Sequence, residues 1–331
     1  MWTRSLRLAG CVVWGELERL TRGLPRSWAG FMRDWDRSLR SANRPETTRY
    51  NYLLAVSQLA RFLADEAVTD LECVAAAEDP VEVRRGHVEL FQVWMIESRS
   101  AATALNKHKG LQQFFKWLWL DEEEIERSPM ERVRQPKVTR RLIPVIRDED
   151  TGRVLATCKG KEFVHLRDEA IIRLYYNTGA RLSEVGDLRL EDVDLDRDTV
   201  VYRGKGGKER RVRFGPRTGR ALSRYLRARD RHVAAGLPDL WLAERGRRAL
   251  APNGIKLMLK RRGRAAGVAG VHAHRWRHNF AHEWKRAGGD TGDLMLLLGW
   301  ESEDMPRHYG ASAAAERAQE SQTRMGIGEN V

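Results

Sequence analysis

Three prolines interrupt the middle of this 331-residue chain, at Pro129, Pro136 and Pro144. They lie in a basic stretch, Arg127 to Pro144, whose apolar residues follow neither a helical nor a strand period. Proline fixes φ and has no backbone N–H, so this stretch cannot continue a helix or a central strand. At roughly 150 residues per domain, the length also suits two domains. We therefore predict an interdomain linker here, with a folded domain on each side.

Helical patterns dominate the part of the chain before the linker. Thr47 to Leu63 carries apolar residues at roughly helical spacing, and Ala101 to Trp119 repeats the pattern. A stripe of this period normally faces the interior of a helical domain, so the aromatic side chains are most simply core residues. We predict an all-α domain on this side.

The part after the linker mixes helix and strand signals. Leu166 to Asn177 is amphipathic with a helical period, and a short helix is predicted from about Leu182. Thr199–Arg203 and Arg210–Phe214 are strand-like runs, and the glycine-rich segment Gly204–Lys208 between them is typical of a hairpin. The predicted fold class is therefore mainly α with a small antiparallel β-sheet (α+β).

Several classes of protein are excluded by composition. Cys11, Cys73 and Cys158 lie far apart and match no disulfide framework or zinc motif. The longest apolar runs are far shorter than the roughly 18 residues that span a bilayer. Leu8–Cys11 is similar to a lipoprotein cleavage site, but arginines interrupt the apolar stretch that a signal peptide needs before it. We interpret the start of the chain as an ordinary helix and expect a cytoplasmic protein.

The net charge of +13 is concentrated beyond the linker. Residues 1–139 hold 21 Lys and Arg against 20 Asp and Glu, whereas residues 140–331 hold 38 against 26. Within Arg203–Arg231, 12 basic residues face only Glu209 and Asp230. A run of that density repels itself unless an anionic partner lies against it. Nucleic acid is the expected partner, because each phosphate that is neutralised also releases counterions.

Other chemical motifs are weaker. Gly204–Lys208 has neither the G-x-x-x-x-G-K-[ST] spacing nor the following helix of an ATP-binding loop. His272, His274 and His278 form a histidine cluster without the carboxylate or the third ligand of a metal motif. The G-x-S-x-G motif of a serine nucleophile is absent from the sequence.

Four segments together carry a more specific arrangement. They are Thr178–Val185 (TGARLSEV), Gly204–Arg210 (GKGGKER), His274–His278 (HRWRH) and Leu297–Trp300 (LLGW), with Tyr309 nine residues after the last. In this order and spacing they resemble the tyrosine recombinases, the phage integrase and Xer-type family. That family's pattern is Arg, Lys, His-x-x-Arg, His or Trp, and then Tyr. The matching residues here are Arg181, Lys205, His274, Arg277, Trp300 and Tyr309.

The resemblance implies transesterification at a DNA phosphodiester. Tyr309 would attack phosphorus to form a 3′-phosphotyrosyl link and a free 5′-hydroxyl. Its phenol is protonated at neutral pH, and His274 could take that proton. Arg181 and Arg277 could donate paired hydrogen bonds to the non-bridging oxygens, where negative charge develops. Lys205, at the tip of the predicted hairpin, would protonate the leaving oxygen.

Two further residues of these segments have supporting roles. Trp300 replaces the histidine that is common at this position in bacterial relatives, although other members carry Trp. An indole N–H donates a hydrogen bond but cannot transfer a proton, so Trp300 can bind the phosphate and cannot act as acid or base. Glu184 resembles a carboxylate that lies behind the reacting groups and steadies them. The covalent link keeps the energy of the cleaved bond, so the resemblance implies no cofactor and no metal.

The resemblance also implies two domains that clamp duplex DNA. We expect an N-terminal extension at residues 1–26, a helical core DNA-binding domain at 27–136, a linker at 137–144 and a catalytic domain at 145–331. The Ala-rich segment Ala311–Arg324 matches the family's C-terminal helix, which packs against a neighbouring protomer. A tetramer on DNA would then exchange strands through a Holliday junction. Candidate DNA contacts are the basic residues Lys107, Lys109, Lys116, Arg203, Lys208, Arg210 and Arg211.

Two other functions remain open at this point. One is a DNA-binding protein of the same fold that no longer cuts, against which the six matching residues argue. The other is a type IB topoisomerase-like enzyme, and the spacing from Trp300 to Tyr309 favours recombination over it. With about 26 residues before the helical region, we expect a Xer-like or mobile-element recombinase rather than one with an arm-binding domain. Integration, excision and dimer resolution, with or without an accessory factor or partner recombinase, all fit.

Overall fold

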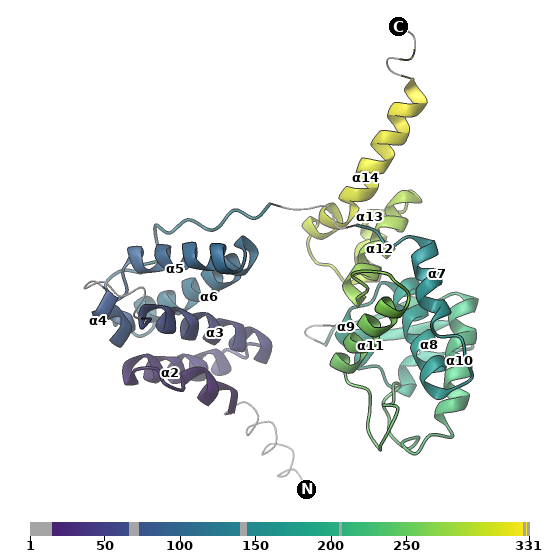
Figure 1. Cartoon of the computed structure of the whole chain (residues 1–331), viewed down its shortest axis with the longest axis horizontal. Coiled ribbons are helices and arrows are strands. Elements are labelled where there is room, and N and C mark those ends of the chain that lie inside the picture. The colour runs from purple at the N-terminus through teal and green to yellow at the C-terminus, as the bar shows by residue number, and fades with distance from the viewer. Residues whose placement is uncertain (1–14, 66–72, 140–143, 205–206, 327–328, 330–331) are drawn as a thin grey trace. The chain divides into compact units, whose positions relative to one another are not determined.

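The computed structural model describes residues 15–65, 73–139, 144–204, 207–326 and 329. The chain divides into two compact units, Met1–Arg140 and Arg141–Val331 (Figure 1). The helix expected around Leu8–Cys11 lies outside the described residues. Within the described ranges, no helix is both long enough and apolar enough to cross a membrane.

The described part of the first unit is built from helices and loops. Residues 15–21 are helical. The helices that follow are α2 (Arg26–Ser41), α3 (Glu46–Leu63), α4 (Cys73–Glu78), the 3-10 turn η1 (Pro80–Glu82), α5 (Arg85–Ser98) and α6 (Ala101–Leu120). The helices predicted at Thr47–Leu63 and Ala101–Trp119 are confirmed as α3 and α6. Ser100 starts α6, because its hydroxyl accepts a hydrogen bond from the Thr103 N–H at 3.2 Å.

Aromatic side chains fill the core of the first unit. Trp35 of α2 lies edge-on to Phe114 of α6 at a centroid distance of 5.1 Å and stacks on Tyr52 of α3 at 5.8 Å. The indole N–H of the buried Trp28 donates to the Ala76 carbonyl at 3.1 Å. The aromatic residues of the predicted helices therefore pack the three longest helices together, as expected for core residues.

The second unit combines helices with one small sheet. Its elements are α7 (Asp148–Ala156), α8 (Phe163–Thr178), α9 (Leu182–Gly186), η2 (Leu190–Asp192), β1 (Val193–Asp194), β2 (Thr199–Arg203), β3 (Glu209–Arg213), α10 (Pro216–Arg229), α11 (Pro252–Ala265), α12 (Ala273–Arg286), α13 (Thr291–Leu298) and α14 (Asp304–Met325). The predicted helix at Leu166–Asn177 is confirmed as α8, and the predicted strands correspond to β2 and β3. The fold class is mainly α with a three-stranded antiparallel sheet.

The sheet has the order β1-β2-β3, and its pairing decides which residues face inward. Val200 pairs with Val212 and Tyr202 with Arg210. Val200, Tyr202 and Val212 are buried, whereas Arg203 and Arg211 are exposed. Because side chains alternate along a strand, Arg210 shares the inward face with Val212.

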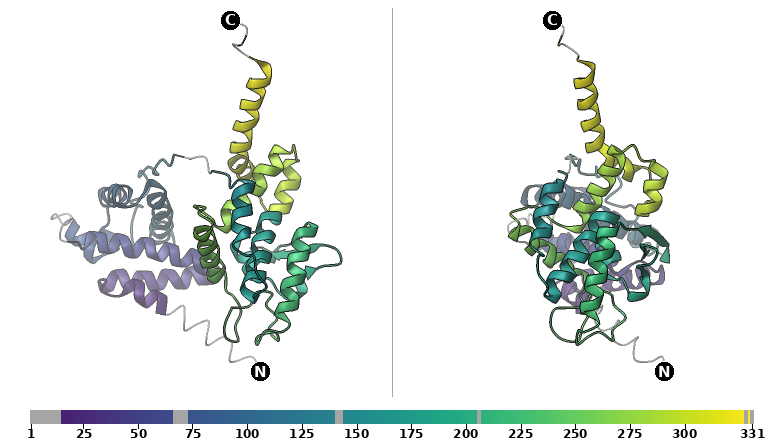
Figure 2. Two further views of the ribbon diagram at one scale, coloured as in Figure 1. Left: turned by 45° about the vertical axis from the view of Figure 1, so that its right-hand side comes forward. Right: turned by 90° about the vertical axis from the view of Figure 1, so that its right-hand side faces the viewer.

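Helix α8 organises the second unit. It packs against α10 on one side and α12 on another, and its Tyr175 ring stacks on Trp276 of α12 at 6.3 Å (Figures 1 and 2). A smaller apolar cluster that includes Leu294, Leu298 and Trp300 joins α12 to α13 and the following turn. Helix α14 begins at Asp304, earlier than the predicted Ala311, and so includes Tyr309.

Candidate active site

A sharp turn at the end of α8 directs the chain into the candidate site. Gly179 ends the helix with φ of +61°, a conformation that favours glycine. A Cβ there would lie 2.9 Å from side-chain atoms of both Phe280 and Leu298. The turn therefore needs glycine for its backbone angle and for its close packing, and it places Arg181 at the start of α9.

Arg181 and Glu184 hold each other at the N-terminus of α9. The Arg181 N–H donates to Glu184 Oε2 at 2.7 Å, and its Nη1 donates to Oε1 at 2.8 Å. A carboxylate also suits the positive end of a helix. The Arg181 side chain is 40% exposed, whereas that of Glu184 is 2% exposed. Glu184 thus lies behind Arg181 and leaves the guanidinium facing solvent.

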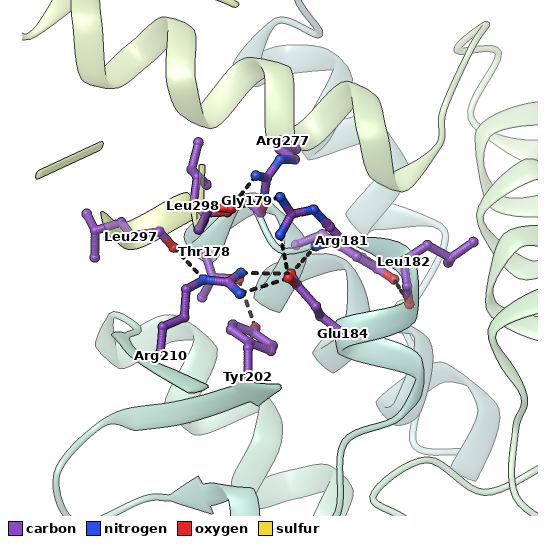
Figure 3. A network of polar contacts seen from close by, with 12 residues as sticks. Thr178, Gly179, Arg181, Leu182, Glu184, Tyr202, Arg210, Arg277, Leu297 and Leu298 are labelled. Atoms are coloured by element: carbon purple, nitrogen blue, oxygen red, sulfur yellow. Dashed lines mark hydrogen bonds and ion pairs between the residues drawn. The ribbon is translucent and has the colours of Figure 1, made fainter. Parts of the chain in front are cut away.

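Arg210 reaches the same carboxylate from β3. Its Nη1 and Nη2 donate to the two oxygens of Glu184 at 2.8 and 2.7 Å, a bidentate pair (Figure 3). Its guanidinium also lies 5.0 Å from the ring centroid of Tyr202, whose hydroxyl is 2.9 Å from that of Thr178. The Arg210 side chain is only 12% exposed. It ties the hairpin to α9 rather than facing solvent.

The charge of Glu184 is set by these partners. Burial alone raises the pKa of the Glu184 carboxyl, but the hydrogen bonds from Arg210 and Arg181 outweigh it and lower the pKa to about 2. Glu184 therefore stays ionised at every pH at which a DNA enzyme works.

Arg277 of α12 enters the site from the other side. It is 2% exposed, and its Nη1 donates to the Gly179 carbonyl at 3.0 Å while its Nη2 donates to that of Leu298 at 2.6 Å. The guanidinium lies 5.1 Å from the ring centroid of Trp300. Two carbonyls and an indole face thus fix the orientation of this arginine.

The C-terminus of α13 holds all three arginines. The last carbonyls of a helix have no partner within it and carry partial negative charge, which suits guanidinium donors. Three consecutive carbonyls accept one arginine each: Leu297 from Arg210 Nε at 2.7 Å, Leu298 from Arg277 at 2.6 Å and Gly299 from Arg181 Nη2 at 2.9 Å. A single turn therefore sets the spacing between residues that come from α9, β3 and α12 (Figure 3).

Trp300 directly follows that turn. Gly299 adopts φ of +61°, and the Trp300 N–H donates back to the Met295 carbonyl at 2.9 Å, which is a Schellman-type helix end. The Trp300 side chain is buried in the apolar cluster of α12 and α13 while its ring covers Arg277. It is therefore both a core residue and a neighbour of the arginines.

His274 lies in the first turn of α12, three residues before Arg277. This spacing places both on one side of the helix, and His274 is exposed. The preceding His272 begins the helix, because its ring Nδ1 accepts the Arg275 N–H at 3.2 Å. Among the described residues, no group of three or more His, Cys, Asp or Glu is placed to hold a metal ion.

The two remaining candidates are less fully described. Lys205 lies outside the described residues. Lys208, on the second arm of the hairpin, pairs with Glu301 at 2.6 Å, which brings that arm next to the Trp300 turn. Tyr309 lies in α14, whose backbone packs against α12, and its side chain is outside the described part of the chain.

The predicted DNA contacts occupy different environments. Lys109, Lys116 and Arg211 are exposed. Lys107 is half-buried, and burial lowers the pKa of its ammonium group. Arg203 pairs with acidic neighbours, at 2.5 Å with Asp192 and 3.0 Å with Glu209. The inward position of Arg210 was missed, although the alternation of buried residues along β3 was a signal that could have found it.

Comparison with known proteins now identifies the family. The model of the phage integrase family matches residues 144–316, which is more than half of the chain. The model of the phage integrase N-terminal SAM-like domain matches residues 31–125. The chain belongs to the phage integrase family. It is a site-specific tyrosine recombinase of the Xer type, an enzyme class that transfers DNA strands.

The recombinase is similar to curated relatives over most of its length. It is 32% identical to tyrosine recombinase XerC of Ralstonia pickettii, over 69% of this chain and 75% of that protein. It is also 32% identical to tyrosine recombinase XerD of Mycobacterium tuberculosis, over 77% of this chain and 84% of that protein.

Two solved structures show the same fold. One is the XerH site-specific recombinase bound to palindromic difH substrate, with a TM-score of 0.68, 19% identity and coverage of 87% of this chain and 81% of that one. The other is a lambda integrase dimer bound to a COC′ core site, with a TM-score of 0.65, 17% identity and coverage of 88% and 79%.

Proposed function

We propose that this recombinase cleaves duplex DNA with Tyr309 and holds the strand as a 3′-phosphotyrosyl intermediate. The observation that carries the proposal is the cluster of Arg181 and Arg277, which α13 spaces and Glu184 supports. These residues come from segments almost a hundred positions apart in the sequence, in the family's order.

The two arginines act on the non-bridging oxygens of the phosphate. Attack on phosphorus passes through a five-coordinate transition state that carries more negative charge than the substrate. Guanidinium groups that are already oriented stabilise this charge without reorganising. Arg181 is the more exposed of the pair and meets the phosphate from solvent, while the N–H of Trp300 adds a donor that holds no transferable proton.

Protons and bonds balance within the site. The phenolic oxygen of Tyr309 forms a bond to phosphorus, and His274 takes its proton. The bond from phosphorus to the 5′-oxygen breaks, and Lys205 gives that oxygen a proton. Attack by a 5′-hydroxyl then reverses every step and rejoins the strand. Each step exchanges one phosphoester for another, so the scheme uses neither a nucleotide cofactor nor a metal ion.

The wider assembly follows the relatives. We propose a core DNA-binding domain at residues 27–136 and a catalytic domain at 145–331, joined by a linker at 137–144. Four protomers on DNA would exchange strands through a Holliday junction, with the end of α14 packing on a neighbour. Support comes from a similar lambda integrase that was solved as a tetramer bound to a Holliday junction, with a TM-score of 0.62.

Trapping the covalent intermediate tests the proposal. The protein is incubated with randomised duplexes whose nicks let the 5′ fragment escape, and DNA that stays attached in denaturing detergent is sequenced. We expect adducts for the native protein and none for Tyr309→Phe, with unchanged DNA binding. Adducts that persist in Tyr309→Phe would show that another residue is the nucleophile. Tight binding without adducts in the native protein would favour a protein that no longer cuts.

A further inference from the structure

A row of arginines occupies the exposed face of α10. Arg217, Arg220, Arg224 and Arg227 follow one another at intervals of three and four residues, so they share one side of the helix. With Arg173 of α8 they line a groove of about 540 Å³. We call these five residues the α10 arginine stripe.

The stripe carries almost no compensating charge. Helix α10 has no Asp or Glu between Pro216 and Arg229. Among the described residues, Glu169 is the ion-pair partner of the stripe, and it binds Arg173 and Arg224 at 2.8 Å each. Asp198 also lies against α10, with its Oδ1 3.0 Å from where a Cβ of Gly219 would be. Within the described ranges, the structure shows no carboxylate within 4.0 Å of the guanidinium groups of Arg217, Arg220 or Arg227.

This arrangement costs stability in the absence of a ligand. Like charges at spacings of three and four residues on one side of a helix repel each other and destabilise it. An anion along the stripe removes that repulsion. Because the charged residues are all arginines, their planar forks also match the oxygens of phosphate groups better than ammonium groups do.

The shape of the stripe fits a nucleic-acid strand. From Arg217 to Arg227 the helix rises about 15 Å. One strand of duplex DNA presents a phosphate about every 3.4 Å along its axis, so this length spans several phosphates. The hydroxyl of Ser223, which lines the same groove and accepts from Arg227 at 3.2 Å, adds a neutral donor for a phosphate oxygen.

The distance between the stripe and the candidate active site increases along α10. The first turn of α10 adjoins the active-site end of α8, where the Gly215 N–H donates to Asn177. Arg224 pairs with Glu169, which lies ten residues before Gly179 and therefore about 15 Å from that turn along α8. A phosphate between Arg181 and Arg277 cannot also contact this part of the stripe.

We propose that the α10 arginine stripe binds the phosphate backbone of a DNA segment outside the cleaved site. The segment is either the flank of the same duplex or a second duplex, and both present the same chemistry. The inference rests on the proposed function only in taking DNA as the partner, and it is independent of which residue is the nucleophile.

The test uses a triple variant, Arg217→Gln, Arg220→Gln and Arg227→Gln, which leaves both ion pairs of Glu169 in place. A matched control, Arg19→Gln, Arg153→Gln and Arg197→Gln, removes equal charge from exposed arginines that pair with Glu16, Asp150 and Asp194. Affinity is measured against salt on duplexes of increasing length around one centre, and with a second duplex added.

For the stripe variant we expect native affinity on the shortest duplex that is cleaved and a deficit that appears as the duplex lengthens. Loss of three phosphate contacts makes the slope of log affinity against log salt less steep by about 2.7. Between 50 and 200 mM salt, the native protein should therefore lose roughly 40-fold more affinity than the variant. A deficit that appears only with the second duplex assigns the stripe to binding in trans. Cleavage of the shortest duplex should be unchanged.

Three results would overturn the inference. Equal deficits in the stripe and control variants would mean that net charge alone matters. A full deficit on the shortest cleaved duplex would place the stripe within the cleaved site. No deficit on any DNA, with loss of binding to an acidic protein instead, would assign the stripe to another partner. If no duplex is cleaved, the proposed nucleophile fails while the length series still decides the role of the stripe.

Discussion

The three arginines of the candidate site and the α10 arginine stripe place the same side chain in opposite environments. In the site, each of Arg181, Arg210 and Arg277 donates to a carbonyl at the C-terminal end of α13, and two of them also bind Glu184. In the stripe, the guanidinium groups meet little besides Glu169 and solvent. Arginines that hydrogen bonds hold in one orientation stabilise negative charge at one point. Exposed arginines in a row, here called unfixed, attract negative charge along the length of the row. The first property affects rates, and the second affects affinity and its salt dependence.

Removing Arg277 tests the site most severely. In Arg277→Ala the transition state loses a donor that is oriented before the substrate arrives, so we expect the cleavage rate to fall by about 100-fold or more. DNA affinity should change little, because most of the binding energy comes from other phosphate contacts. Single-turnover cleavage of nicked duplexes and binding titrations measure the two quantities separately. Equal losses in rate and affinity would mean that Arg277 only positions the phosphate.

Arg210 has two possible roles that an experiment can separate: the structure indicates a positioning residue, whereas the sequence predicts a direct DNA contact. As a positioning residue it acts through Glu184 and the Leu297 carbonyl, so Arg210→Gln should slow cleavage by roughly 10-fold or more while DNA affinity stays close to native. As a direct DNA contact, it would instead lower the salt slope by about 0.9 and leave the rate unchanged. Arg211→Gln, on the exposed face of the same strand, is the matched control.

The sequence predicts which residues form the site, but not which contacts hold them in place. Order and spacing of the motifs were enough to bring Arg181, Arg277 and Trp300 into one predicted site, and the structure places them together. Local motifs cannot show that carbonyls at the end of α13 space these arginines, because the contact of Arg181 with Gly299 joins residues 118 positions apart.

The basic run from Arg203 to Arg231 makes the same point for charge. The sequence predicts one DNA-binding surface, but the structure divides the run into different roles. Arg203 pairs with acidic neighbours, and Arg210 is directed inward. Arg229 is 1% exposed and donates to the carbonyls of four residues in the following loop. The helical period could have separated Arg229 from the stripe, since it falls on the opposite side of α10.

Acid should lower the free energy of unfolding through Glu184 in a defined range of pH. The pKa of its carboxyl is about 2 in the folded protein, below the ordinary value of 4.5, so the unfolded chain takes up this proton first as the pH falls. The stability that the ionised Glu184 carboxylate contributes is complete above about pH 5 and is lost as the pH falls from about 4.5 towards 2. By pH 3.5 it has decreased by roughly 1 kcal/mol.

Urea unfolding at pH 7 and pH 3.5 measures that contribution. Glu184→Gln should be less stable than the native protein at pH 7, because Arg181 and Arg210 lose their carboxylate. Between the two pH values it should lose about 1 kcal/mol less stability than the native protein. Parallel pH profiles for the two proteins would mean that Glu184 does not carry the depressed pKa. Glu149→Gln, at an exposed position of α7, controls for the loss of one carboxylate.

Exchanging arginine for lysine in the stripe gives the smallest expected effect, and the same exchange in the site completes the comparison of the two regions. Counterion release depends on charge, so Arg220→Lys in the stripe should keep the native salt slope on long duplexes, whereas Arg220→Gln should lower it by about 0.9, or roughly 3-fold in affinity between 50 and 200 mM salt. In the site, Arg210→Lys should resemble Arg210→Gln in cleavage rate, because an ammonium group cannot reach both oxygens of Glu184 and the Leu297 carbonyl together. Restoration of cleavage by lysine at position 210 would show that charge alone suffices there, and the distinction between fixed and unfixed arginines would then fail at its most sensitive position.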